Sequence, residues 1–328
     1  MDSYSERLRA GDTRWLARAL TAVVEHAPEA EALLRAALPL AGGAKVIGLT
    51  GAPGSGKSTL ADVLARAYRD AGETLGIVAV DPTSPFSGGA ILGDRIRMQA
   101  HHGDPGIFIR SLATRGTLGG LAAAASDVVT LLDASGKNRI LVETVGVGQD
   151  EVDIIKLADV TVVVLVPGMG DAVQALKAGI MEIADIFVVN KSDRGPERLE
   201  QEIRALLALA ASSGDQAGAA WRPPIVRTIA TEGSGTPELQ AAIGQRLDWM
   251  EAHGGLEHFR ALQWVERLRQ FARARLADRL LAPLLDEARL RSLAQSVAHH
   301  TTDPYTAVDA VIAEAVARAN ISKLKVGG

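Results

Sequence analysis

The chain has 328 residues, 47% of them apolar and 4% aromatic, and its 35 basic and 39 acidic residues give a net charge of −4. This length allows one large α/β domain with additions, or two domains. The charge balance offers no basic footprint, so we expect no nucleic-acid partner and no anionic membrane partner. The absence of cysteine from the sequence excludes disulfides and thiolate metal sites.

The sequence also bears on where the protein works. Residues 1–7 lack the apolar core of a secretory signal. The longest apolar run, 160–167, is too short to cross a bilayer. Together with the lack of cysteine, these features lead us to expect a cytoplasmic protein.

The first 41 residues are expected to form a helical extension. Asp12 can cap a helix over 13–26, and a second helix is expected over 30–38. The glycine pair 42–43 then marks the junction with a different pattern.

Residues 42–250 alternate between short apolar runs and helical stretches. Such alternation is typical of a mainly parallel sheet that helices cover on both faces, so we expect an α/β fold. Strands are predicted at 45–50, 76–80, 107–110, 139–142, 160–166, 186–189 and 225–229, and helices at 57–70, 117–134, 171–181, 196–211 and 236–250.

Beyond residue 250 the pattern is helical, and we expect 251–328 to form a C-terminal helical region. An unbroken helix is predicted over 256–282, and a last helix over 304–318 with Asp303 as its cap. The first of these carries an apolar stripe, which either packs on the chain's own sheet or meets a partner. We favour the partner and predict a homodimer.

Residues 51–59 match the phosphate-loop pattern G-x-x-x-x-G-K-[ST] between a predicted strand and a predicted helix. Its glycines let backbone N–H groups turn toward phosphates, Lys57 reaches the outer phosphates, and the Ser58 hydroxyl can ligate Mg²⁺. The fold is therefore expected to be that of a P-loop NTPase. The nucleotide-binding residues predicted in the loop are Gly51, Pro53, Gly54, Ser55, Gly56, Lys57, Ser58 and Thr59.

The base is predicted from the run Asn190-Lys191-Ser192-Asp193, which follows a strand. The Asp193 carboxylate can accept the N1–H and 2-amino groups of guanine, an arrangement that adenine does not offer. Lys191 would lie along the base, and Asn190 would tie this turn to the phosphate loop. Ala230, after the next strand, is placed to offer its backbone N–H to the guanine oxygen. We therefore expect bound GTP or GDP rather than ATP.

Carboxylates at two strand ends are expected to face the phosphates. Asp81 ends the second strand, Asp94 follows in the next loop, and Glu143 follows the strand 139–142. Beside Ser58 they suit direct or water-mediated binding of Mg²⁺. With Lys57, Asp94 and Glu143 are our catalytic candidates. A turn cap for Asp81 and an ion pair for Asp94 remain open alternatives.

The loop after Glu143 is expected to respond to the γ-phosphate. Gly146 can offer its N–H to that group, so GTP and GDP would hold the loop differently. Val147 stands where Ras-like GTPases carry a water-positioning glutamine, and Gln149 comes two residues later. This predicts slow unaided GTP hydrolysis that a partner stimulates.

Several longer motifs resemble the MeaB/ArgK GTPases, the family of the human methylmalonic aciduria type A protein. The resemblance extends over about residues 10–320, and its motifs lie at 81–84, 88–98, 108–110, 116–120, 143–149 and 167–185.

This resemblance implies a homodimeric P-loop GTPase with helical extensions at both ends. It further implies a chaperone that assists adenosylcobalamin loading and protection of methylmalonyl-CoA mutase or a related acyl-CoA mutase. By the same resemblance, 81–97 and 143–153 would be switches I and II, and 168–177 a third switch. The residues carried over to the third switch are Asp171, Gln174 and Lys177.

The sequence argues against two other functions. A nickel-insertion GTPase needs cysteine and histidine ligands, but the chain has no cysteine and His101-His102 indicates a polar loop. A transport ATPase or kinase is disfavoured because the motif at 190–193 indicates guanine. Arg110 is either a further phosphate or switch contact or a surface arginine at a strand end.

Overall fold

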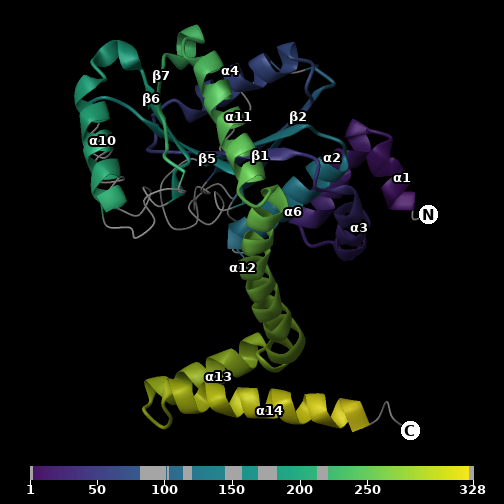
Figure 1. Cartoon of the computed structure of the whole chain (residues 1–328). Coiled ribbons are helices and arrows are strands. Elements are labelled where there is room, and N and C mark those ends of the chain that lie inside the picture. Colours follow the sequence, from purple (N-terminus) through teal and green to yellow (C-terminus); the bar gives the residue numbers. More distant parts are fainter. Residues whose placement is uncertain are drawn as a thin grey trace. The chain divides into compact units, whose positions relative to one another are not determined.

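The computed structural model describes residues 3–81, 101, 103–113, 120–144, 157–168, 183–212 and 221–324. These residues form two compact units, Met1–Gln263 and Trp264–Gly328. The first unit holds the sheet (Figure 1). Helix α12, Leu256–Leu276, begins in the first unit and ends in the second.

The first unit is built on a seven-stranded parallel sheet of order β3-β2-β4-β1-β5-β6-β7. All seven predicted strands are present, which confirms the expected parallel α/β fold. Strands β5 and β6 are buried along their whole length, as parallel strands covered on both faces must be. The strands are β1 Lys45–Thr50, β2 Leu75–Asp81, β3 Ile107–Ala113, β4 Arg139–Thr144, β5 Val160–Leu165, β6 Ile186–Asn190 and β7 Ile225–Thr228.

Helices cover both faces of the sheet. Helices α4 (Lys57–Asp70) and α11 (Thr236–Ala252) share a core with one face. Helix α6 (Gly120–Ala134) packs over the other face at β2 and β4, and α10 (Glu197–Ser212) packs there over β5 and β6. The helix predicted over 171–181 lies outside the described residues.

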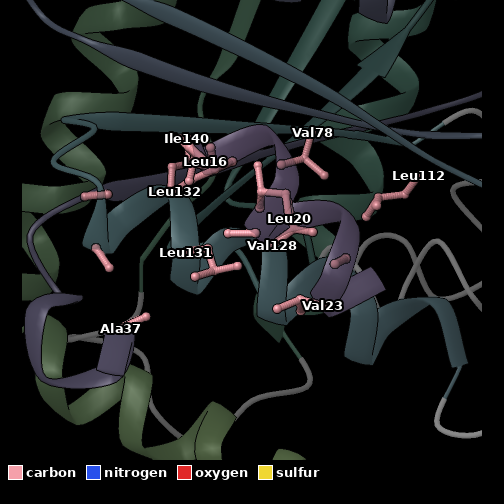
Figure 2. Close-up of a cluster of buried hydrophobic side chains, with 14 of the residues drawn as sticks. Leu16, Leu20, Val23, Ala37, Val78, Leu112, Val128, Leu131, Leu132 and Ile140 are labelled. Atoms are coloured by element: carbon pink, nitrogen blue, oxygen red, sulfur yellow. The ribbon is translucent and has the colours of Figure 1, made fainter. Parts of the chain in front are cut away.

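Three N-terminal helices extend the layer around α6: α1 (Ser3–Arg9), α2 (Thr13–Val24) and α3 (Ala30–Ala37). As predicted, Asp12 caps α2, because its carboxylate accepts the N–H groups of Arg14 and Trp15 at 2.9 and 3.1 Å. Figure 2 shows the apolar side chains of α2 beside those of α6. The N-terminal helices therefore share a hydrophobic core with the sheet.

Two aspartates, the buried Asp159 and the partly buried Asp185, hold the edge of the sheet where the strands begin. Asp159 precedes β5, and its N–H and carboxylate each bond the backbone of Val46 at 2.8 Å. Asp185 precedes β6 and bonds Thr161 in the same way, at 2.9 and 2.8 Å. Each carboxylate therefore adds one rung to the hydrogen-bond ladder between neighbouring strands.

An arginine binds each of these aspartates. Arg260 of α12 meets both oxygens of Asp159, at 2.8 and 2.7 Å, and donates to the carbonyls of Gly42 and Ala44. Arg246 of α11 lies 2.7 Å from the Asp185 carboxylate. These contacts attach α11 and the first turns of α12 to the sheet.

Arg246 also lies over three aromatic rings. Its guanidinium carbon is 5.3, 4.8 and 5.7 Å from the ring centres of Trp221, Trp249 and Phe259. Burial raises the pKa of the Asp185 carboxyl, and the charge of Arg246 opposes that shift. The ion pair therefore compensates a carboxylate that the fold removes from water.

The second unit is helical. The helix predicted over 256–282 is wrong at its end: α12 stops at Leu276, and a π-helical turn (Ala277–Leu281) and a 3₁₀ turn (Ala282–Leu284) follow. Pro283 has no N–H for a regular helix, which accounts for the change. Helices α13 (Glu287–Ala298) and α14 (Pro304–Leu324) follow.

The core of this unit is small and consists of Leu284, Val311 and Ala315, with leucines packed around it. Asp303 caps α14 as predicted, accepting the N–H groups of Tyr305 and Thr306.

Among the described residues, no helix is both long and apolar enough to cross a membrane.

Candidate nucleotide site

The strand order brings the predicted nucleotide-binding segments to one edge of the sheet. The phosphate loop follows β1, Glu143 lies in β4 beside it, Asn190 ends β6, and Ala230 follows β7. Ligands of parallel α/β proteins bind at this edge, outside the carboxyl ends of the strands.

Three glycines of the phosphate loop have positive φ: Gly51 at 147°, Gly54 at 76° and Gly56 at 91°. A Cβ at Gly51 would overlap the Val164 carbonyl oxygen, and one at Gly56 would overlap the Asn190 side-chain amide. Other residues therefore do not fit at these two positions. The loop leads directly into α4, whose N-terminus favours an anion.

The loop also orients Lys57, which is 5% exposed. Its ammonium donates to the carbonyls of Gly51 and Ala52 at 2.7 and 2.9 Å. The positive charge is thus held inside the loop, where phosphates would lie. Pro53, Gly54 and Thr59 are exposed, whereas Ser55 is buried.

Ser58 and Glu143 form the expected pair beside the phosphate loop. The Ser58 hydroxyl donates to Glu143 Oε1 at 2.5 Å, and Glu143 is 3% exposed. A hydroxyl that donates its proton to a carboxylate keeps its oxygen lone pairs for a cation. These two residues fit Mg²⁺, which nucleotide sites hold through few protein ligands together with phosphates and water.

Asn190 joins three parts of the site and is 2% exposed. Its Nδ2 donates to Ser55 O at 2.8 Å, which is the contact with the phosphate loop expected from the sequence. Its Oδ1 accepts the Thr228 hydroxyl and the Ala230 N–H, both at 3.1 Å. Because two donors meet Oδ1, the amide must present Nδ2 to Ser55.

Sequence reasoning missed Thr228. Thr228 is 1% exposed, and its hydroxyl orients Asn190 from the end of β7. Its position two residues before Ala230 is the sequence feature from which this role could have been predicted. The Ala230 N–H, expected to meet guanine, bonds Asn190 in this structure, so a guanine contact would have to share or replace that bond.

The remaining residues of the base motif lie on a tight turn. Lys191 has a φ of 55°, and its ammonium donates to Gly54 O at 2.9 Å. Asp193 lies in the 3₁₀ turn Ser192–Arg194, and its side chain is 54% exposed. Its carboxylate is therefore accessible to a base that lies along Lys191.

Five further residues of the predicted site lie outside the described residues, namely Asp94, Gly146, Asp171, Gln174 and Lys177. Asp81 ends β2, and its backbone pairs with Ala113 of β3.

Arg110 and His101 have other contacts than those considered from the sequence. Arg110 donates to the Thr21 hydroxyl of α2 at 3.1 Å, so it joins β3 to the N-terminal helices. His101, expected in a polar loop, is 8% exposed, and its Nε2 lies 2.7 Å from Asp62 Oδ1. No cluster of three or more metal-binding side chains occurs among the described residues.

A phosphate loop entering α4 and an Asn-Lys-x-Asp turn at the end of β6 place the chain among the P-loop GTPases. Residues 16–284 match the family model for the methylmalonyl Co-A mutase-associated GTPase MeaB. The chain belongs to this family, which confirms the resemblance read from its motifs.

Individual relatives also support the membership of the chain in this family. A GTPase relative from Pyrococcus abyssi is 45% identical over 317 residues, covering 96% of this chain and 97% of that one. The GTPase ArgK of Escherichia coli is 33% identical and covers 92% of each chain. The mitochondrial methylmalonic aciduria type A homolog of Mus musculus is 36% identical, covering 68% of this chain and 55% of that one.

Among solved structures, a LAO/AO transport system kinase matches with a TM-score of 0.68 and 28% identity, covering 94% of this chain and 95% of that one. The chain is thus a GTPase, which binds guanine nucleotide and hydrolyses GTP to GDP and phosphate.

Proposed function

We propose that this GTPase is a cytoplasmic regulator of an adenosylcobalamin-dependent acyl-CoA mutase, with methylmalonyl-CoA mutase as the first candidate. It would assist cofactor loading and protect the loaded mutase. The observation that carries this proposal is the match of residues 16–284 to a family named for its association with that mutase. The similarity to the mouse methylmalonic aciduria type A homolog supports it.

At the nucleotide, Lys57 neutralises charge on the outer phosphates while water attacks the γ-phosphorus in line. Ser58 and Glu143 would hold Mg²⁺, with Asp81 and Asp94 as further ligands or as acceptors for its bound water. When bound, Mg²⁺ spreads the negative charge that develops on the phosphates. Asp193 and Lys191 would bind the guanine base, and Asn190 would hold their turn against the phosphate loop.

The hydrolysis is proposed to be slow until the mutase binds. Val147 occupies the position of the usual water-positioning glutamine. Gly146 would sense the γ-phosphate, and the segment 168–177 would report the mutase through Asp171, Gln174 and Lys177. In this proposal the hydrolysis of GTP serves to change the conformation of the protein, and the release of phosphate determines when that change occurs.

The same proposal includes a homodimer in which 251–328 contributes the contact, with 42–250 as the G domain and 1–41 as its N-terminal extension. On α14, Ala307, Val311 and Ala315 are buried. Spaced likewise along that helix, Val308, Ile312 and Val316 are 56%, 43% and 51% exposed. Apolar side chains in such a row favour contact with another protein surface.

The test uses the purified full-length chain with the adenosylcobalamin-dependent mutases of its own organism. We expect one of them to bind the GTP-loaded protein and to raise its turnover of GTP. Lys57→Ala, which removes the phosphate-binding charge, serves as the inactive control. If no mutase binds or changes the rate, while GTP is still hydrolysed, the mutase role is refuted and the GTPase assignment stands.

A transport kinase is the alternative that a specific observation favours, because a solved relative carries that description. The two functions differ in the phosphate acceptor. Incubation with γ-labelled GTP releases free phosphate from a GTPase, whereas a kinase transfers the label to a second protein. Label on a second protein would favour the kinase.

A further inference from the structure

Ser55 is a buried residue of the phosphate loop whose hydroxyl the reaction described above does not use. The residue is 1% exposed. Its backbone groups are bonded, because its N–H donates to Ala52 O at 3.1 Å and its carbonyl accepts Asn190 Nδ2 at 2.8 Å. Its hydroxyl, by contrast, has no hydrogen-bond partner among the residues that the structure describes.

The surroundings of this hydroxyl are formed by backbone. It lies beside Gly51, 3.3 Å from the point that a Cβ would occupy there. The Val164 carbonyl oxygen is on the same side of Gly51, 2.2 Å from that point, but the hydroxyl makes no hydrogen bond with it. The Ser55 hydroxyl is therefore enclosed where the phosphate loop meets β5.

An unbonded hydroxyl in such a place destabilises the loop conformation that encloses it. A buried polar group that has lost its hydrogen bonds to water and gained none in the protein costs free energy. An alanine at this position would not carry that cost. The cost applies to the closed conformation of the loop, since a loop that opens would return the hydroxyl to water.

The conformation that encloses Ser55 is also the one that presents the phosphate-binding groups. In it, the Lys57 ammonium is held by the carbonyls of Gly51 and Ala52, and the loop enters the N-terminus of α4. When a binding-competent conformation is only partly populated, the apparent affinity falls in proportion to that population. A side chain that disfavours this conformation therefore weakens nucleotide binding.

We propose that Ser55 is a positioning residue whose hydroxyl lowers the affinity of the phosphate loop for nucleotide and so speeds the release of GDP. It acts through the loop conformation, and its side chain does not touch the nucleotide. Product release limits the turnover of many enzymes, so a faster release of GDP shortens the interval before the next GTP binds. The inference needs only the GTPase activity and is independent of any partner protein.

The experiment measures the rate at which fluorescently labelled GDP leaves the full-length protein, together with its dissociation constant. For Ser55→Ala we expect slower release and tighter binding, each on the order of tenfold, which is about 1.4 kcal/mol and lies within the cost of one unbonded buried hydroxyl. Most of the change in affinity should come from the release rate. Ser55→Cys keeps nearly the same volume with a weaker donor and should change both quantities in the same direction.

The matched control is Ser126→Ala on α6. Ser126 is 3% exposed, and its hydroxyl likewise has no partner among the described residues, but none of the predicted nucleotide-binding residues lies on α6. Its replacement should raise the melting temperature and change GDP release less than about twofold, because the two sites are independent.

The outcomes separate a role in nucleotide binding from a purely structural one. Thermal unfolding shows whether each variant is folded, and Ser55→Cys decides the question if Ser55→Ala is not. A higher melting temperature with unchanged GDP release would mean that the cost falls equally on the free and the bound loop, which would overturn the inference. Faster release of GDP would overturn it as well, because the hydroxyl would then help to hold the nucleotide.

Discussion

Arg260 is expected to contribute strongly to stability, and Arg260→Met tests this. The substitution keeps the length of an apolar stem but removes two contacts to Asp159 and two to backbone carbonyls. Asp159 is 2% exposed at its side chain, so its charge would remain buried. Only the Val46 N–H among the bonds described above would still oppose that charge. Removing one partner of a buried ion pair costs about 3–5 kcal/mol.

The assay is equilibrium unfolding in urea, followed by circular dichroism at constant protein concentration. Arg35→Met is the matched control, because Arg35 pairs with Glu31 on α3 at 78% and 46% side-chain exposure. An exposed pair of this kind is worth below about 1 kcal/mol. Adding Asp159→Asn should recover part of the loss caused by Arg260→Met. If Arg260→Met cost no more than Arg35→Met, the reasoning about the buried carboxylate would be refuted.

Three further predictions concern the base, the acid stability and the dimer. Asp193→Asn should lower GTP affinity at least about tenfold, because two hydrogen bonds to a charged group are lost; competition between GTP and ATP measures this, and retained guanine selectivity would contradict it. The hydrogen bond from Arg69 lowers the pKa of Asp104 below its ordinary value of 3.8, so the stabilisation from this pair is present above about pH 4 and is lost as the pH falls through the folded-state pKa. In unfolding curves between pH 3 and 6, Asp104→Asn should therefore show a weaker loss of stability in acid, and an unchanged curve would argue against the assignment. Ile312→Glu should convert the proposed dimer into monomers, which light scattering measures with Glu314→Gln as the control. A molar mass that Ile312→Glu leaves unchanged would exclude the exposed apolar row of α14 as the dimer contact.

The sheet could be predicted from sequence because its strands are buried on both faces. Strands such as β5 and β6 therefore read as continuous apolar runs between helical stretches. The contact of Asn190 with the phosphate loop was likewise predictable, because the two motifs lie at the carboxyl ends of two parallel strands, β1 and β6, with only β5 between them. These features depend on local patterns and on the rule that parallel strands end at one edge.

Contacts between distant side chains could not be predicted. Nothing local in the sequence pairs Arg260 with Asp159, His101 with Asp62, or Thr228 with Asn190, because each pair depends on tertiary folding. The end of α12 was missed for another reason. The prediction extends an unbroken helix to residue 282, but Pro283 has no N–H for a regular helix, and π-helical and 3₁₀ turns form instead.

The aspartates at the start of β5 and β6 have a consequence for the opposite end of the sheet. A parallel strand can slip by two residues and still point the same side chains to the same face. Such a slip of β5 would carry Val164 about 6.6 Å along Gly51, and Asp159 opposes it because the slip would break the hydrogen bond from the Val46 N–H to its carboxylate. Gly51 needs glycine for its positive φ. The Asp159 carboxylate at the far end of the neighbouring strand adds a second reason, since it favours the register that brings the Val164 carbonyl against the phosphate loop.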